Sequence, residues 1–367
     1  MSRIFNLSLS DAEYPIYISD DIFLNFERYL DKLELYGEIV FIVDEFIEKK
    51  YFHTDTLMRK KNSLNVYIVA GMKNNKTFYS ALKIFEYLED KNIARDAIII
   101  AIGGGVIGDL VGFIASCWYR GVDLIHIPTT LLSSVDSCVG GKTAINFRNT
   151  VNAIGSYHHP KAILIDTKIL SDLPEREISS GFGEIIKYAM LGCTKIMEIL
   201  SNADFNFSRD LEILIELSLK EKEMFVKDDI RESARRLYLN FGHTIGHAIE
   251  FSTIFNGEES LRHGEGVGLG MLAVLRIGIE LGYLHHDDAC LLRNLLEKFS
   301  LPIAFPASKV GLSRDILVER VINLCFKDKK RTQDGLRLVL LDGIGTPFIY
   351  KTFDRELIAK GVMEVII

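Results

Sequence analysis

The stretch that decides the fold is "AIIIAIGGGVIGDLVGF", residues 97–113. It begins with a continuous apolar run, which suits a strand buried on both faces. A glycine turn and a second apolar segment with helical character follow. Gly103, Gly105 and Gly108 fit the spacing G-x-G-x-x-G, in which bare backbone can approach a pyrophosphate at a helix N-terminus. The order strand, glycine turn, helix predicts a nucleotide-binding α/β unit, although glycine turns of this kind also serve packing alone.

Similar apolar runs recur through the first half of the chain and predict further strands of the same sheet. They lie at residues 38–44, 64–70, 123–128 and 162–166. Segments with helical periodicity, such as 77–90, separate them. Strands that alternate with crossover helices predict a mostly parallel sheet covered by helices.

After about residue 174 the pattern becomes helical, and a short β pair and a last helix close the chain. The segments with 3.6-residue periodicity are 178–193, 209–229, 235–252, 264–282 and 287–299. A chain of 367 residues exceeds the usual size of one hydrophobic core, and Pro174 interrupts the pattern between the halves. We therefore predict two domains: an α/β nucleotide-binding domain over 1–174, and a mainly α-helical metal- and substrate-binding domain over 175–367.

The composition argues against several classes of function. The formal net charge is −7 and no long basic run is present, which disfavours nucleic acid as a partner. No apolar stretch reaches the roughly 20 residues that span a bilayer, and the first residues lack the pattern of a signal peptide. The five cysteines are scattered and include no C-x-x-C, so we expect reduced thiols in a cytoplasmic enzyme.

The segment "LNFGHTIGHAIE", residues 239–250, places His243 and His247 four positions apart on one predicted helix, and His263 follows in "RHGEG". Neutral imidazole is a common metal ligand, and an i, i+4 pair directs both rings to one spot. Glu184 in "GFGEIIKYA" would complete a His-His-Glu set, which is a known catalytic zinc ligation. Histidines packed in the core or solvated at the edge of a helix remain the alternative.

Glu184 and Lys187 are one turn apart, a spacing for which a surface salt bridge is the usual explanation. Gly181, Gly183 and the apolar neighbours make a solvated face less natural here.

In the first domain, Asp44 ends a predicted strand and either holds ribose hydroxyls or caps a helix. "SCVGGKTAIN", residues 137–146, contains G-K-T, but Asp136 stands where the ATPase pattern needs glycine. Lys142 in this segment is either an anion-binding residue or a solvated lysine in a turn.

Several of these stretches together resemble 3-dehydroquinate synthase. They are "GGGVIGDLVGFIASCWYRGVDLIHIPTTLLSSVDSCVGGKTAIN", "NAIGSYHHP", "LIDTKILSDLP", "SGFGEIIKY", "LNFGHTIGHAIE", "HGEGVGLGM" and "KDKKRTQDGLRLVLLDGIG". The similarity runs in register from about Asp44 to Gly345, and the combination is far more specific than any one motif. It implies conversion of 3-deoxy-D-arabino-heptulosonate 7-phosphate to 3-dehydroquinate and phosphate in the shikimate route. It also implies NAD that is transiently reduced, zinc or cobalt as the metal, and a homodimer.

The resemblance assigns roles to individual residues. The metal ligands would be Glu184, His243 and His263, so that His247 becomes a substrate contact although its spacing alone suggests a ligand. NAD would be held by Asp44, Lys76, Gly104, Gly105, Val106, Ile107, Gly108, Asp109, Thr129, Thr130, Lys142 and Leu170. Substrate would be held by Asp136, Lys142, Asn152, Lys187, Lys222, Arg236, Asn240, His247 and the stretch Asp328, Lys329 and Lys330. Arg120 would reach the site of the neighbouring subunit.

The chain departs from the family pattern at two places in the implied NAD site. Met72-Lys73 replaces Gly-Glu, and Val151 replaces a lysine. We therefore expect NAD to bind more weakly than in relatives, unless Lys73 or Arg148 compensates. Two other functions stay open: a related sugar-phosphate cyclase that makes an inosose or a valiolone, and a non-catalytic relative that has lost NAD.

Overall fold

The structure is a computed structural model that describes residues 3–52, 65–71, 75–148, 150–229, 232, 234–255, 260–327 and 335–367. It divides into two compact units, Met1–Leu173 with Leu211–Glu223, and Pro174–Asp210 with Met224–Ile367. The first division lies next to the proposed boundary at residue 174. The segment Leu211–Glu223 belongs to the first unit, whereas the sequence had placed it in the helical domain.

The first unit is built on a seven-stranded sheet with the order β1-β2-β9-β6-β5-β3-β4. The strands are β1 (Arg3–Ser8), β2 (Glu13–Ser19), β3 (Ile39–Asp44), β4 (Asn65–Val69), β5 (Ile98–Gly103), β6 (Asp123–Pro128) and β9 (Ala162–Asp166). β1 and β2 are antiparallel, and all other neighbouring strands are parallel. The five predicted strands are therefore present, and the predicted mostly parallel sheet is confirmed.

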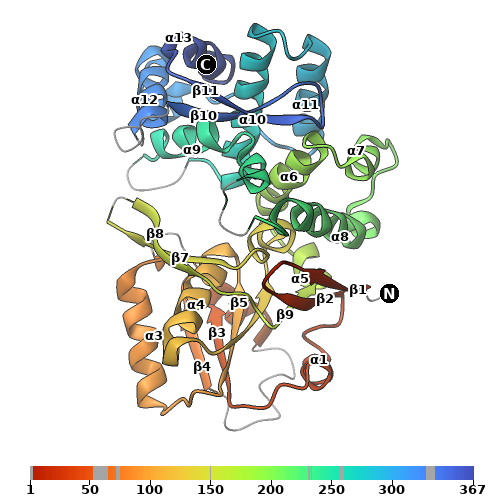
Figure 1. Ribbon diagram of the computed structural model, residues 1–367, viewed down its shortest axis with the longest axis vertical. Helices are drawn as coiled ribbons and strands as arrows, with labels where there is room; N and C mark the ends of the chain where they lie inside the picture. The colour runs from red at the N-terminus through yellow and green to blue at the C-terminus, as the bar shows by residue number, and fades with distance from the viewer. Residues whose placement is uncertain are drawn as a thin grey trace. The chain divides into compact units, whose positions relative to one another are not determined.

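Helices cover both faces of this sheet (Figure 1). They are α1 (Phe26–Lys32), α2 (Glu45–Ile47), α3 (Phe78–Asp90), α4 (Gly105–Cys117) and α5 (Thr167–Ser171). In β3, Val40 and Ile42 pack in the core formed with α3 and α4, while Phe41 and Val43 pack in the core formed with α1 and α2. This alternation is the period of two of a strand buried on both faces, and it explains why the runs are apolar throughout.

The strand order reverses between β3 and β5. From β3 the chain first adds β4 on one side and then β5 on the other. The connections after β3 and β5 lead to α2 and α4, which pack on opposite faces of the sheet. Ligands of such sheets bind outside the carboxyl ends of the strands at this switch point. The glycine turn after β5 and Asp44 at the end of β3 both lie there.

A separate antiparallel hairpin, β7 (Lys142–Phe147) and β8 (Thr150–Tyr157), completes the first unit together with part of α8 (Phe207–Val226). Ion pairs and hydrogen bonds join α8 to the first strands. Arg3 Nη1 lies 2.6 Å from Glu216 Oε2, and the Ser8 backbone N–H donates to Glu223 Oε1 over 2.8 Å.

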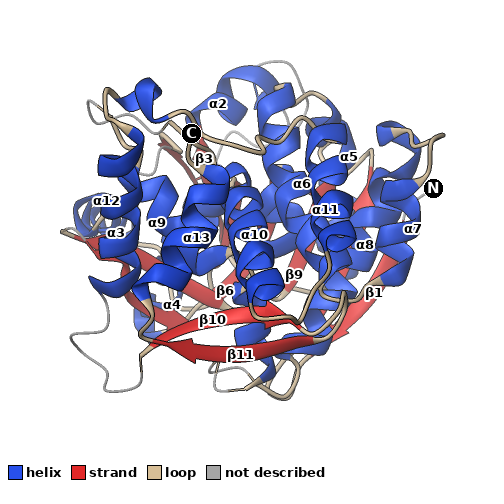
Figure 2. Ribbon diagram, turned by 90° about the horizontal axis from the view of Figure 1, so that it is seen from above, coloured by secondary structure: helices blue, strands red, loops and turns tan. Residues whose placement is uncertain are grey.

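The second unit is mainly helical, as predicted. It contains α6 (Glu175–Met190), α7 (Thr194–Ser201), α9 (His243–Ser252), α10 (His263–Glu280), α11 (His286–Lys298), α12 (Arg314–Lys327), α13 (Arg355–Val365), and the hairpin β10 (Leu336–Leu341) and β11 (Pro347–Thr352). Figure 2 shows α10 with α9 and α13 to one side and α6 and α11 to the other. α10 is buried from Gly264 to Leu275, as expected of a helix that is apolar all round. Within the described residues, no helix is long and apolar enough to cross a membrane.

Glycines allow α10 to approach α6 and α9 at backbone distance. A Cβ atom on Gly264 would lie 1.8 Å from the Ser180 carbonyl oxygen of α6, and one on Gly270 would lie 1.9 Å from the Gly242 carbonyl oxygen. No larger residue fits at either position without moving a helix. The glycines next to the histidine motifs are therefore explained by this packing, which brings three helices together at one point.

Candidate metal and nucleotide sites

Glu184 on α6, His243 on α9 and His263 on α10 meet at this point. Glu184 is fully buried, and its Oε1 lies 3.4 Å from His243 Nε2 and 3.3 Å from His263 Nε2. Neither carboxylate oxygen has a partner with hydrogen-bond geometry among the described residues. Ligand atoms of a tetrahedral zinc ion with bonds of about 2.0–2.1 Å lie about 3.3 Å apart. The distances from Glu184 Oε1 to the two imidazole nitrogens therefore match the spacing of ligands around one tetrahedral ion.

Lys187, one turn after Glu184, is also buried and contacts Glu184 Oε2. Burial by itself raises the pKa of Glu184, but the charges of Lys187 and His243 outweigh it and hold that pKa well below its ordinary value. Burial lowers the pKa of His263, but its contacts with the carboxylates of Glu184 and Glu250 outweigh it and raise that pKa to about 9. The pair Glu184–Lys187 is thus a buried ion pair rather than a solvated one.

His247 completes a triangle with the other two histidines. Its ring centroid lies 5.3 Å from that of His243 and 5.4 Å from that of His263, and the three rings offer ligand atoms within 4.8 Å of one another. His247 is exposed, while the other two rings are partly buried. The structure therefore brings the three histidines together, and Glu184 contacts two of them, His243 and His263.

Sequence reasoning missed Glu250 in this cluster. Its side chain is buried, and its Oε2 lies 3.5 Å from His263 Nδ1. The sequence contained a pattern that could have identified it, because positions 243, 247 and 250 follow the i, i+4, i+7 spacing of one helix face.

Arg236 and Asn240 lie in the short helix η5 (Arg235–Asn240) that precedes α9. Arg236 is nearly fully buried, and its backbone N–H and that of Ala234 donate to Asp229 Oδ2 over 2.9 and 2.7 Å. Asn240 Nδ2 donates to Glu232 Oε1 over 2.8 Å. The predicted substrate residues Asp328, Lys329 and Lys330 lie outside the described residues.

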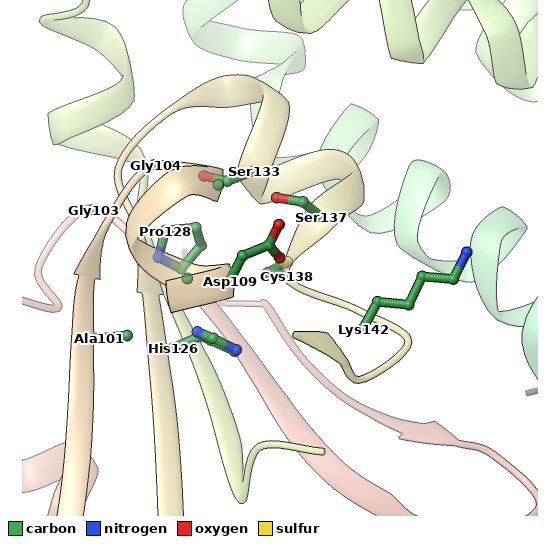
Figure 3. Close-up of a pocket in the computed structure, with 12 residues that line it drawn as sticks. Ala101, Gly103, Gly104, Asp109, His126, Pro128, Ser133, Ser137, Cys138 and Lys142 are labelled. Carbon is green, nitrogen blue, oxygen red and sulfur yellow. The ribbon is translucent and has the colours of Figure 1, made fainter. Parts of the chain in front are cut away.

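The glycine turn after β5 lines a small pocket in the first unit (Figure 3). The other residues that line it include Asp109, His126, Ser133, Ser137, Cys138 and Lys142. Among the described residues, no side chain caps the N-terminus of α4, which follows Gly104. A Cβ atom on Gly104 would lie 3.0 Å from Thr130 Cγ2, and one on Gly105 would lie 3.0 Å from Ser137 Oγ. Bare backbone at an uncapped helix N-terminus fits a pyrophosphate group, so the turn is suited to a dinucleotide.

Asp44 ends β3 beside this turn. Its Oδ1 accepts a hydrogen bond from the Phe46 backbone N–H over 2.8 Å and so caps α2. Burial raises the pKa of Asp44 above its ordinary value. A Cβ atom on Gly71 would lie 1.7 Å from Asp44 Oδ2, so glycine leaves the space that this carboxylate fills. The capping role is thus observed, while the contact to ribose stays a prediction.

The other residues of the predicted NAD site differ in accessibility. Thr129, Ile107 and Leu170 are buried. Thr130 is partly buried, and its Oγ1 lies 2.9 Å from Ser133 Oγ.

Lys76 is a buried lysine that joins two of the predicted sites. Its Nζ contacts the carboxylate of Asp109 on α4 and the side-chain oxygen of Asn152 on β8. Asn152 has a left-handed backbone (φ 54°), which asparagine tolerates better than most residues. Val151, beside it, is 47% exposed, and Met72 and Lys73 lie outside the described residues.

Lys222 on α8 and Asp136 form a second buried contact, in which Nζ lies 3.0 Å from Asp136 Oδ1. Lys142 begins β7, is exposed, and extends away from Asp109 in Figure 3. Because the loop before Lys142 leads into a strand and not into a helix, it is not the phosphate loop of an ATPase.

Arg120 ends a short helix, η3 (Trp118–Arg120), and is exposed. Tyr119 and Arg120 have φ values of 46° and 69°. Two successive left-handed residues other than glycine cost roughly 1–3 kcal/mol each, and such strain gathers at functional sites.

Comparisons with known proteins indicate the family of the chain. The family described as "3-dehydroquinate synthase N-terminal" matches residues 66–180, and the family described as "3-dehydroquinate synthase C-terminal" matches residues 181–331. The chain is 38% identical to the 3-dehydroquinate synthase of Dictyoglomus turgidum, over 98% of this chain and 97% of that protein. It is 37% identical to the 3-dehydroquinate synthase of Shewanella halifaxensis, over 98% of this chain and 99% of that protein.

Among solved structures, the chain is similar to a 2-deoxy-scyllo-inosose synthase complexed with carbaglucose-6-phosphate, NAD+ and Co2+. The TM-score is 0.83 and the identity 25%, over 99% of this chain and 100% of that one. A 2-epi-5-epi-valiolone synthase from Streptomyces hygroscopicus, with NAD+ and Zn2+ bound, has the same fold. Its TM-score is 0.78 at 20% identity, over 97% of each chain.

Proposed function

Because the chain belongs to the 3-dehydroquinate synthase family, we propose that it converts 3-deoxy-D-arabino-heptulosonate 7-phosphate to 3-dehydroquinate and phosphate with NAD and one divalent ion. The observation that carries the proposal is the cluster of Glu184, His243 and His263, in which two imidazole nitrogens lie 3.3–3.4 Å from one buried carboxylate oxygen. This cluster lies in a chain that is 38% identical to a 3-dehydroquinate synthase over nearly its full length.

The metal would be held by Glu184 Oε1, His243 Nε2 and His263 Nε2. Zinc and cobalt both accept this donor set, and a bound ion would supply a Lewis acid for substrate hydroxyls. Glu184 is kept ionised by Lys187, and His243 Nδ1 lies 3.1 Å from the Phe241 carbonyl oxygen, which fixes the ring with Nε2 toward Glu184.

NAD would bind with its pyrophosphate at the N-terminus of α4, along Gly104 to Asp109, and with a ribose at Asp44. When bound, it would supply a hydride acceptor that is regenerated within one turnover. The support is the helix end without a side-chain cap and the position of Asp44 at the switch point of the sheet.

The cationic residues would bind the two anionic ends of the substrate. Lys142, Lys222 and Arg236 are suited to phosphate or carboxylate, since charge-assisted hydrogen bonds hold and orient such groups. Arg236 and Lys222 are both buried, and Lys222 is also held by Asp136, so Lys222 would meet substrate with little loss of side-chain freedom. The leaving phosphate would serve as its own base, and no dedicated protein base is needed.

A related cyclase that makes another carbocycle is the second candidate. It is favoured by the similarity to a 2-deoxy-scyllo-inosose synthase across the whole chain. A non-catalytic relative is disfavoured, because the metal ligand set and the glycine turn are both intact.

Release of inorganic phosphate tests these candidates. We expect the purified protein to release phosphate from the heptulosonate phosphate with NAD and zinc, and to stop when NAD is stripped. Release from a hexose phosphate instead would identify the related cyclase. No release from either substrate, with metal and NAD bound, would contradict an enzymatic function.

We also propose a homodimer in the cytoplasm. The exposed, strained Arg120 would contribute to the neighbouring site, and scattered thiols without a disulfide pattern suit a reducing compartment. Light scattering at working concentration would give the mass, and a monomer with full activity would exclude the role of Arg120.

A further inference from the structure

We propose that Glu250 is a positioning residue that orients His263 for metal binding and strengthens it as a ligand. The inference rests on the proposed metal site at Glu184, His243 and His263. It concerns a carboxylate that does not touch the ion but acts through the imidazole.

Glu250 reaches His263 because of its place on α9. It lies seven positions after His243 and three after His247, so all three share the face of α9 that packs against α10. On α10, Gly266 lies opposite, where a Cβ atom would be 3.6 Å from Glu250 Oε2. The carboxylate thus lies against α10, one turn from His263, and only 5% of the residue stays exposed.

The two ring nitrogens of His263 face different carboxylates. Nε2 lies 3.3 Å from Glu184 Oε1, and Nδ1 lies 3.5 Å from Glu250 Oε2. Because the nitrogens are on different sides of the ring, Glu250 does not reach an ion bound at Nε2. A carboxylate at Nδ1 instead favours the tautomer with the proton on Nδ1, which leaves the Nε2 lone pair for the metal.

The second histidine is held in a different way. His243 Nδ1 faces a neutral acceptor, the Phe241 carbonyl oxygen, at 3.1 Å. A carboxylate makes an imidazole more electron-rich than a carbonyl does, so His263 becomes the stronger donor of the two. The negative charge of Glu250 also offsets part of the positive charge that a divalent ion adds beside buried Lys187.

The test compares the wild type with Glu250→Gln, which keeps the shape and removes the charge. Zinc affinity is measured by competition with a chromophoric chelator, and the visible spectrum is recorded with cobalt in place of zinc. We expect Glu250→Gln to bind zinc roughly 10–100-fold more weakly, the usual effect of a lost outer-shell partner, and to shift the cobalt bands. Glu280→Gln, which removes an exposed carboxylate at the far end of α10, is the control and should change neither.

A merely structural role would lower the unfolding midpoint without moving the cobalt bands, and that result would overturn the proposal. Unchanged zinc affinity in Glu250→Gln would do the same. If this variant does not fold, Glu250→Asp is used instead. It keeps the negative charge, but its shorter side chain places the carboxylate farther from His263 Nδ1, so it should still bind zinc more weakly than wild type. Equal affinity there would also overturn it. Failure of the wild type to bind zinc at all would instead refute the proposed function.

Discussion

Replacing Gly264 with alanine tests whether the close approach of α10 to α6 holds the proposed metal ligands together. The new Cβ atom would lie 1.8 Å from the Ser180 carbonyl oxygen, whereas real Cβ contacts stay beyond 3.0 Å. The two helices must therefore move apart by at least about 1.2 Å at this point. His263 is the adjacent residue and moves with the start of α10, away from Glu184.

The displacement is large for a metal site and modest for the fold. The distances between a metal ion and its ligand atoms vary by only about 0.2 Å. Loss of an outer-shell partner lowers metal affinity roughly 10–100-fold, and the zinc affinity of Gly264→Ala should fall by more than that. Overpacking costs about 1–3 kcal/mol, and the better helix propensity of alanine returns up to about 1 kcal/mol. We therefore expect a folded protein with little zinc.

Gly268→Ala on the same helix is the matched control. Its Cβ atom would lie 3.0 Å from Leu296 Cδ2, the end of a flexible side chain that can turn aside. Zinc affinity by chelator competition and the unfolding midpoint of the metal-free protein are measured for both variants. The reasoning would be refuted if Gly264→Ala bound zinc as tightly as wild type, or if both variants lost the same amount of zinc affinity.

Four further outcomes are expected. His243→Ala or Glu184→Gln should remove most bound metal and nearly all activity while the circular dichroism spectrum stays unchanged; full metal content in either contradicts the ligand set. NAD should be required but not consumed, so steady-state turnover should accumulate no NADH, and a stoichiometric build-up would indicate a dehydrogenase. Methionine at Lys142 or Arg236 should keep the zinc and lower kcat/KM by one to two decades, since a charge-assisted hydrogen bond contributes about 1.5–3 kcal/mol; unchanged kcat/KM in both would exclude the anion-binding role. Val151→Lys should tighten NAD by less than about 1 kcal/mol in calorimetry, because the position is 47% exposed and a lysine there stays solvated; no change at all would mean that it does not face the cofactor.

The local pattern of apolar residues was sufficient to predict those strands and helices that are buried uniformly along their length. β3 and β5 are covered on both faces, so their apolar runs and their parallel pairing follow from the sequence. β1, β2, β7 and β8 were not predicted, because three of these strands are largely exposed or partly so and β2 contains a proline. The periodicity of α8 predicted a helix, but it could not indicate which unit would pack on Leu211–Glu223.

The cluster of Glu184 and the three histidines shows more clearly what such sequence patterns cannot predict. The i, i+4 spacing puts His243 and His247 on one helix face, and by itself it predicts that both are ligands. Which imidazole faces Glu184 depends instead on where α10 lies, and that position follows from contacts of Gly264 with Ser180 and of Gly270 with Gly242. Ser180 and Gly264 are 84 positions apart, as their side-chain to backbone hydrogen bond records. A rule based on residue spacing within one helix cannot predict a contact between residues so far apart in the sequence. The glycines are therefore as much a part of the proposed metal site as the histidines, since they fix the distance over which Glu184 and His263 meet.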